Sequence, residues 1–152
     1  MKHSYYLYGN INPCRILKAA DKLLNEYCDI AESLKIDTFL CFGTCLGFIR
    51  DGGYIVNDND IDVGIMMGIK DLMAELIKNG FVIKRRGRWR WHFLKYGILL
   101  DVYSNAPRSV RKYFQSFDKV VYEGRAYNVP HPVEEYLKAI YGDWKTKKYR
   151  GL

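Results

Sequence analysis

The segment from Asp58 to Asp62 holds three aspartates within five residues, and the last two are separated by a single isoleucine. Successive side chains of a β-strand point to opposite sides, so residues two apart share a side. If this segment is a strand, Asp60 and Asp62 point into one space. Two carboxylates that close together repel each other unless a cation lies between them. The spacing therefore indicates a site for a divalent metal ion and a phosphate.

A third carboxylate is expected from a neighbouring strand, and Asp101 is the candidate. It lies inside the apolar run of residues 98–103, where an aspartate without a partner is costly to bury. Mg²⁺ prefers oxygen ligands and is often held by one or two carboxylates together with substrate phosphate. Asp60, Asp62 and Asp101 are thus predicted to be both metal ligands and catalytic residues.

Two other structures could account for the acidic segment, a surface turn and a calcium-binding loop. Residues 57–60, with the composition Asn-Asp-Asn-Asp, also resemble a surface turn. A calcium-binding EF-hand loop would need a glutamate at its twelfth position, and counting from Asp58 that position is Ile69. The EF-hand is therefore excluded, while the surface turn stays open at this point.

A Gly-Thr pair, Gly43 and Thr44, follows an apolar run at residues 38–42. A strand that ends in glycine, with a hydroxyl residue at the start of a helix, presents backbone N–H groups to an anion. Gly43 and Thr44 are predicted to bind phosphate in this way. By itself the signal is weak, because many turns between a strand and a helix look the same.

A basic stretch covers residues 84–92. On a strand, alternation would give one face to Arg88, Arg90 and His92 and the other to Trp89, Trp91 and Phe93. One interpretation is a half-buried strand with aromatic residues inside and a solvated basic face. The other is that Arg90 and His92 meet donor phosphates or a polyanionic acceptor, and His92 is a candidate base although a lone histidine is often structural. Nucleic acid is a third possible partner, because basic and aromatic residues interleave.

Hydrophobic periodicity and turn residues predict the elements that position these side chains. A polar lead-in covers residues 1–10, and Asn12 is the expected N-cap of the first helix, with Pro13 at its first position. Helices are predicted at residues 13–34, 43–50, 69–79 and 133–141, and strands at 38–42, 60–66, 81–85, 88–95 and 98–103. Tight turns are expected at Arg86 with Gly87 and at Tyr96 with Gly97, a loop or short helix at 105–115, and a hairpin at 119–129 that turns at Glu123 and Gly124. The order predicts an α+β (α/β-like) fold, a mixed central β-sheet flanked by helices.

The chain has 152 residues, which fits a single domain over residues 1–152. Its net charge of +7 favours anionic partners such as nucleotides, nucleic acid, lipid headgroups or glycans. The four cysteines have neither CxxC spacing nor paired histidines, so no zinc site is expected. A signal pattern and an apolar run of about 20 residues are both missing, and a cytoplasmic location without a transmembrane segment is predicted. The sequence does not indicate the oligomeric state.

Together, these motifs resemble one family. The order of these motifs is similar to that of the polymerase-beta-like nucleotidyltransferase superfamily. It runs from Gly-Thr to a strand with Asp-x-Asp and then to a lone Asp on a later strand. The longer pattern resembles the LicD and fukutin-like phosphotransferases of this superfamily, on two blocks of this sequence. The first block contains Gly43-Thr44-Cys45-Leu46-Gly47, Arg50, Gly52-Gly53, Ile55, Asp58 and Asp60-Ile61-Asp62; the second contains Val129-Pro130, Glu134-Glu135-Tyr136-Leu137 and Tyr141-Gly142-Asp143-Trp144.

The resemblance implies a nucleotidyltransferase fold and Mg²⁺ or Mn²⁺ as cofactor. It implies transfer of a phospho-substituted group, such as phosphocholine or a polyol phosphate, from a CDP-linked donor to a glycan hydroxyl. It adds Gly47, Arg50 and Asp58 to the expected substrate- and phosphate-binding residues, although Arg50 also fits an ordinary cation at a helix end. The closing residues Tyr141, Asp143 and Trp144 are expected to help close the site.

The chain departs from the family pattern at three positions. Val56 and Asn57 replace the usual Pro-Trp, and Asn59 replaces the middle aspartate. Two alternatives to the phosphotransferase therefore stay open. One is a nucleotidyltransferase that moves a nucleoside monophosphate from a nucleoside triphosphate onto a small molecule, protein or RNA. The other is a degenerate nucleotide- or glycan-binding protein, against which the intact Asp60, Asp62 and Asp101 argue.

Overall fold

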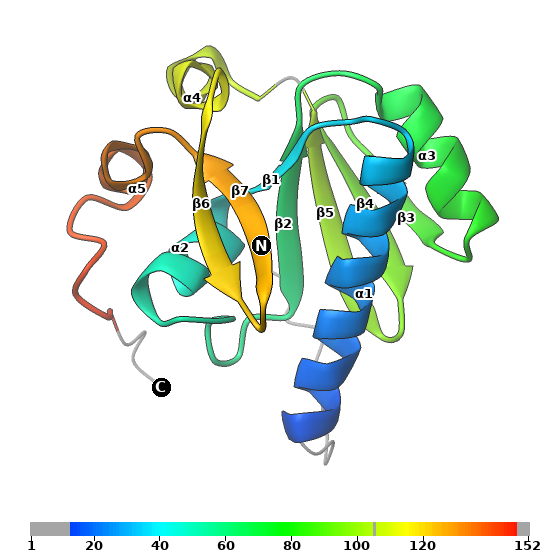
Figure 1. Ribbon diagram of the computed structural model, residues 1–152, viewed down its shortest axis with the longest axis horizontal. Helices are drawn as coiled ribbons and strands as arrows, with labels where there is room; N and C mark the ends of the chain where they lie inside the picture. The colour runs from blue at the N-terminus through cyan, green and yellow to red at the C-terminus, as the bar shows by residue number, and fades with distance from the viewer. Residues whose placement is uncertain (1–12, 105, 149–152) are drawn as a thin grey trace.

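The computed structural model describes residues 13–104 and 106–148 (Figure 1). The expected N-cap Asn12 and the lead-in at residues 1–10 lie outside the described residues. Five strands form the central sheet, in the order β1-β2-β5-β4-β3. They are β1 (Thr38–Leu40), β2 (Asp60–Ile65), β3 (Val82–Arg86), β4 (Arg90–Lys95) and β5 (Ile98–Ser104). The β2–β5 pair is parallel and the other pairs are antiparallel, so the mixed sheet expected from the sequence is confirmed.

One face of this sheet is covered by α1 (Pro13–Ser33) and α3 (Ile69–Lys78), which lie side by side (Figure 1). The covered face is apolar because alternate residues of β2 and β5 are hydrophobic, and Ile61, Val63 and Leu100 are buried. The residues between them, including the aspartates of β2, point to the opposite face. The alternation thus separates a packed face from a face that is available for chemistry.

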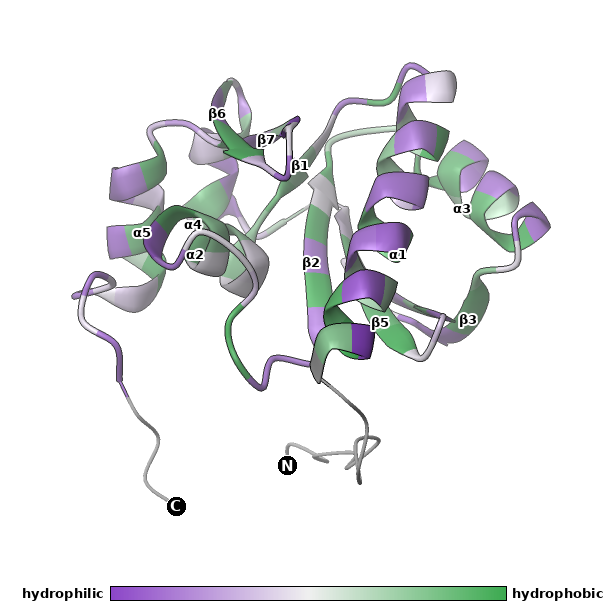
Figure 2. Ribbon diagram, turned by 60° about the horizontal axis from the view of Figure 1, so that its bottom comes forward, coloured by the Kyte–Doolittle hydropathy of each residue, from purple (hydrophilic) through white to green (hydrophobic). Residues whose placement is uncertain are grey.

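The remaining elements pack around β1 and the start of β2, away from α1 and α3 (Figure 2). They are α2 (Phe42–Arg50), α4 (Arg108–Arg111), a short 3-10 helix (Lys112–Phe114), α5 (Val133–Tyr141) and a separate two-stranded sheet of β6 (Phe117–Tyr122) and β7 (Arg125–Pro130). The helix α2 contacts β2 and α5. This group therefore forms a wall beside the uncovered face of the central sheet.

Two predicted turns are confirmed in detail. Tyr96 and Gly97 connect β4 to β5, and Glu123 and Gly124 connect β6 to β7. All four residues have positive φ values, between 48° and 75°. Two-residue hairpin turns of the primed types place residues in this left-handed region, where glycine is favoured. The positions of Gly97 and Gly124 in the sequence therefore correctly indicate where both hairpins turn.

The predicted strand at residues 88–95 was too long, and the tight turn at Arg86 and Gly87 was wrong. The strand β4 begins at Arg90, and residues 87–89 form the connection. The Gly87 N–H donates to the carbonyl oxygen of Arg90 at 2.8 Å, which closes this wider turn. Trp89 consequently lies outside the strand and does not follow the alternation of inward and outward side chains. It is 48% exposed instead of facing inward.

Candidate active site

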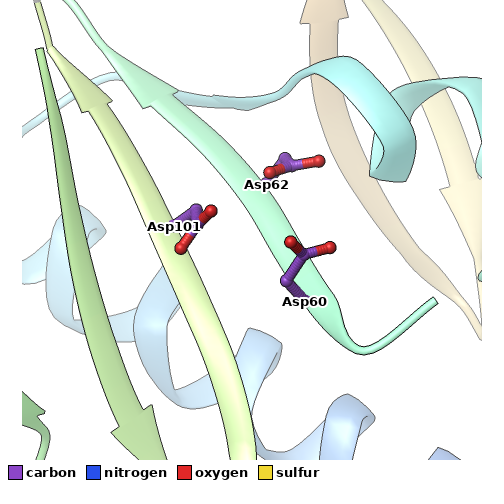
Figure 3. Close-up of side chains that lie close together, drawn as sticks. All are labelled: Asp60, Asp62 and Asp101. Atoms are coloured by element: carbon purple, nitrogen blue, oxygen red, sulfur yellow. The ribbon is translucent and has the colours of Figure 1, made fainter. Parts of the chain in front are cut away.

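The three predicted aspartates come together on the uncovered face of the sheet (Figure 3). Asp60 and Asp62 extend from β2, and Asp101 extends from the neighbouring parallel strand β5, where it is directly opposite Asp62. Each residue offers a carboxylate oxygen, and the three oxygens lie within 4.8 Å of one another. The two-residue spacing on β2 and the lone aspartate of β5 thus build one cluster, as the sequence predicted.

Burial makes this cluster electrostatically costly. Asp62 is 6% exposed and Asp101 is 2% exposed. Burial, followed by the charges of Asp60 and Asp101, raises the pKa of Asp62 well above its usual range. Burial also raises the pKa of Asp101, and the neighbouring His92 acts in the opposite direction. Positive charge nearby, or hydrogen bonds donated to the carboxylates, would stabilise their charged form.

The positive charges beside the cluster contact Asp101 alone. Asp101 Oδ1 lies 2.5 Å from His92 Nδ1 and Asp101 Oδ2 lies 3.7 Å from Arg90 Nη1, whereas Asp60 and Asp62 form no ion pair with another described residue. Closely spaced carboxylates without a positive partner are energetically unfavourable. Hard divalent cations take carboxylate oxygens as ligands. The donor set of Asp60, Asp62 and Asp101 therefore fits a divalent metal ion.

The start of α2 holds Asp62 in place. The Gly43 N–H donates to Asp62 Oδ2 at 3.1 Å, and the Asp62 N–H donates to the Thr44 hydroxyl oxygen at 2.8 Å. Thr44 is only 2% exposed. The Gly-Thr pair thus positions a cluster residue, a role that was not anticipated from the sequence. Phosphate binding by Gly43 and Thr44 stays a prediction.

The loop before β2 packs closely on α2 at a second glycine. A Cβ at Gly47 would lie 2.5 Å from the carbonyl oxygen of Gly53. The absence of a side chain at Gly47 therefore allows residues 53–55 to approach the helix. This loop leads to Asp58, whose Oδ2 would lie 2.9 Å from a Cβ at Gly43. Asp58 thus reaches the edge of the cluster although it precedes β2, while its substrate role and that of Gly47 remain predictions.

Arg50 turns to its neighbour rather than to the cluster in this structure. Its Nε and Nη2 donate to the two carboxylate oxygens of Asp51 at 2.9 and 3.0 Å. Lys147 Nζ also lies 3.3 Å from Asp51 Oδ1. Hydrogen bonding with Asp51 raises the pKa of Arg50. The proposed phosphate contact of Arg50 would require this pair to open, and it stays a prediction.

Arg90 and His92 lie beside the cluster. Both belong to β4, where His92 is directly opposite Asp101 and Arg90 is opposite Tyr103. Arg90 Nη1 lies 3.7 Å from Asp101 Oδ2, and it donates to the Tyr103 hydroxyl at 3.2 Å. The basic residues singled out in the sequence therefore border the acidic cluster, on the side away from α2.

Aromatic side chains lie around the start of α2 and the end of β5. Tyr103, two residues after Asp101, packs against Phe42 with a ring-centroid distance of 4.6 Å. Tyr136 accepts a hydrogen bond from the Phe42 N–H at 2.9 Å and thereby supports the start of α2. Tyr103 was missed in the sequence, although its alternation with Asp101 was a usable signal. Burial, and after it the charge of Asp62, raises the pKa of Tyr141.

A hollow of about 400 Å³ lies elsewhere, between β1, β7 and the end of α1. Its lining includes Thr38, Lys119, Arg125 and Asn128, and none of the predicted site residues. Arg125 is already paired with Asp29 at 2.8 Å. The convergence of buried carboxylates, rather than the size of this hollow, identifies the candidate active site.

Solved structures with a similar fold are nucleotidyltransferases. The antibiotic-resistance factor ANT(2'')-Ia, in solution, superposes with a TM-score of 0.61 at 13% identity, over 75% of this chain and 66% of that chain. The lincosamide antibiotic adenylyltransferase LnuA, in a lincomycin-bound crystal structure, superposes with a TM-score of 0.57 at 15% identity, over 85% of each chain. This chain thus spans slightly less than two thirds of the first of these relatives. No curated protein sequence matches the chain.

The mixed sheet and its flanking helices define the chain as a nucleotidyltransferase-fold protein. The model of one family, described as LicD/FKTN/FKRP, nucleotidyltransferase domain, matches residues 35–132. The chain belongs to this family. Within the described residues, no helix is both long enough and apolar enough to cross a membrane. The predicted cytoplasmic location and single domain stay predictions.

Proposed function

We propose that this protein is a metal-dependent phosphotransferase that moves a phospho-substituted group, of the phosphocholine or polyol phosphate type, from a CDP-linked donor to a glycan hydroxyl. The observation that carries this proposal is the convergence of Asp60, Asp62 and Asp101 within 4.8 Å, with two of them buried. Family membership over residues 35–132 adds the expected reaction class.

In this proposal the three aspartates hold Mg²⁺ or Mn²⁺. A bound divalent ion would neutralise charge on the donor diphosphate and on the departing nucleotide. The Gly43 and Thr44 turn keeps Asp62 aligned through the two hydrogen bonds at the start of α2. Asp58, Arg90 and His92 border the donor phosphates, and Arg50 joins them if it leaves Asp51.

Asp101 is the proposed general base. Its place beside Asp60 and Asp62, on the neighbouring strand β5, suits a group that binds a second metal ion or takes the proton of the acceptor hydroxyl. The acceptor hydroxyl oxygen forms a new bond to the transferred phosphorus, and its proton passes to Asp101. The bond from that phosphorus to the CMP oxygen breaks, and CMP leaves with the electron pair.

The test is to incubate the protein with Mg²⁺ or Mn²⁺ and a panel of CDP-alcohols and nucleoside triphosphates, and to identify the products. Release of CMP from a CDP-alcohol, with CTP and ATP inert, is the expected result. Release of pyrophosphate from a nucleoside triphosphate would instead assign the nucleotidyltransferase alternative. Undiminished turnover in the Asp62→Ala variant, or no metal-dependent binding or turnover, would contradict both enzyme assignments and favour a binding protein.

A further inference from the structure

A row of charged residues crosses the uncovered face of the sheet. Asp62 on β2 is opposite Asp101 on β5, Asp101 is opposite His92 on β4, and His92 is opposite Arg85 on β3. Directly opposite residues of neighbouring strands extend to the same face. Since neighbouring strands are about 4.8 Å apart, Arg85 stands roughly 10 Å from Asp101. The row changes from acidic at the cluster to basic at the edge of the sheet.

The basic end of this row belongs to a larger surface, which we call the basic hairpin. It consists of exposed side chains on β3, on the connection to β4 and on the start of β4: Lys84, Arg85, Arg86, Arg88 and Arg90. The sequence has no aspartate or glutamate between Glu75 and Asp101. Among the described residues, only Arg90 of this set forms an ion pair. The other four charges are therefore available to an anionic partner.

The length of the basic hairpin favours a partner with repeated charges. At about 3.3 Å per strand residue, Lys84 and Arg88 are separated by roughly 13 Å or less. Lys84 lies on β3, which is at the edge of the sheet because it pairs with β4 alone, and Arg88 lies in the connection to β4. A single phosphate would meet only one or two of these side chains. A chain molecule with several anionic groups matches the whole surface.

The aromatic content of the basic hairpin favours a glycan over nucleic acid. Trp89 is 48% exposed at the tip, and the Arg88 guanidinium lies 5.7 Å from its ring centroid. Trp91, the other tryptophan of this segment, is half-buried against the core. Proteins that bind single-stranded nucleic acid stack successive bases on several aromatic side chains. One exposed ring among arginines instead suits a single sugar ring within an anionic chain.

We infer that the acceptor is an anionic glycan, which lies along the basic hairpin and places its reacting hydroxyl at the aspartate cluster. This inference rests on the proposed function, because it names the acceptor class of that same site. Arg85 and His92 would meet the anionic group nearest the reacting hydroxyl, and Arg88 would meet a group further along the chain. Electrostatic attraction by this surface would also speed the encounter with the acceptor.

The test measures binding of a fluorescein-labelled oligogalacturonate by fluorescence anisotropy, in EDTA and without donor. The expected result is binding that weakens as salt is added, with no binding of a labelled neutral dextran. The triple variant Lys84→Gln, Arg85→Gln and Arg88→Gln should bind about tenfold more weakly, since exposed charge contacts each contribute little but add together.

The matched control removes three positive charges from another part of the surface. Arg108→Gln, Lys112→Gln and Lys138→Gln change exposed or partly exposed residues on and beside α4 and on α5, away from β3 (Figure 1). This triple variant should retain binding within about twofold, because long-range charge effects are screened at physiological salt. Equal weakening in both triple variants would overturn the inference. Circular dichroism of both variants establishes that they are folded.

Two further measurements separate the alternatives. Tighter binding of a labelled single-stranded oligonucleotide, or co-sedimentation with phosphatidylglycerol vesicles in preference to the glycan, would overturn the inference. If CDP-alcohols are turned over but oligogalacturonate does not bind, this inference fails and the proposed function stands. If oligogalacturonate binds through the basic hairpin but no donor is turned over, the proposed function fails and the anionic-glycan surface stands.

Discussion

His92 and Asp101 are directly opposite each other on the antiparallel strands β4 and β5, with His92 Nδ1 2.5 Å from Asp101 Oδ1. The second oxygen of Asp101 lies 3.7 Å from Arg90 Nη1. Asp101 therefore stands between the two aspartates of β2 and two basic residues of β4. The contacts with His92 and Arg90 orient the carboxylate of Asp101.

Replacement of His92 by alanine should weaken Mn²⁺ binding by about tenfold, because groups that orient a metal ligand typically contribute 10- to 100-fold to metal affinity. Isothermal titration calorimetry with MnCl₂ measures this effect. His131→Ala provides the control, since His131 pairs with Asp118 in another part of the molecule. Unchanged affinity in His92→Ala would show that the contact does not position Asp101.

Replacement of Asp62 by asparagine should separate stability from metal binding. Without metal, Asp62→Asn should melt at a higher temperature than the wild type, because a buried charge among like charges is removed. Mn²⁺ at about 100 times its Kd should stabilise the wild type by about 2.7 kcal/mol, and the variant by much less. Thermal melts with Mn²⁺ and with EDTA test both statements. Asp71→Asn, an exposed change on α3, should melt like the wild type and should keep the response to Mn²⁺.

The parts of the fold that the sequence predicted correctly depend on local signals. The alternation of Asp60 and Asp62 with apolar residues established both the strand and its two faces. Gly97 and Gly124 marked hairpin turns because the left-handed conformation favours glycine. Asp101 was recognised because a lone carboxylate in an apolar run is too costly without a partner. These three signals were sufficient for the aspartate cluster.

The parts that were missed depend on specific contacts that hydrophobic periodicity does not encode. Thr44 bonds to Asp62 across 18 residues of chain. Arg50 pairs with its sequence neighbour Asp51, although the helical pattern gives no sign of this pair. Trp89 follows the same alternation as Trp91, yet the turn closed by Gly87 removes it from the strand. Side-chain direction in such places is decided by tertiary structure.

Replacement of Thr44 by valine should impair both stability and function. The change preserves the shape of the side chain but leaves the buried Asp62 N–H without its acceptor, which costs about 1–3 kcal/mol. Chemical denaturation should show this loss, and turnover should fall because Asp62 is no longer aligned. Thr44→Ser keeps the hydroxyl and is the matched control. If valine and serine behave alike, the hydroxyl does not hold Asp62.

Replacement of Gly47 by alanine should displace the loop before β2. The added Cβ would lie 2.5 Å from the Gly53 carbonyl oxygen, and overpacking of this kind costs about 1–3 kcal/mol. Because the loop leads to Asp58, Mn²⁺-dependent turnover should fall as well. Gly53→Ala is the control, since its Cβ would lie 3.4 Å from the Tyr122 ring. Equal stability of the two variants would contradict the close approach.

The contribution of Asp118 to the stability of the start of α5 should depend on pH. Its carboxylate contacts His131 Nδ1 at 2.8 Å and accepts a hydrogen bond from the Val133 N–H at 3.0 Å. The hydrogen bond with His131 holds the pKa of Asp118 below its usual value, and the Val133 N–H adds to this effect. A lowered folded-state pKa gives stability that is present above the unfolded-state pKa and is lost as pH falls through the folded-state value.

At neutral pH, Asp118→Asn should therefore be less stable than the wild type by about 1 kcal/mol, the usual contribution of a carboxylate that caps a helix start. The difference should shrink below about pH 4, where the unfolded carboxyl becomes protonated, and should vanish once the folded-state carboxyl is protonated too. Urea denaturation at a series of pH values measures it. Asp37→Asn, an exposed change outside the helices and strands, should show no such pH-dependent difference. A difference between wild type and Asp118→Asn that stays constant into acid would mean that shape, rather than charge, holds the start of α5.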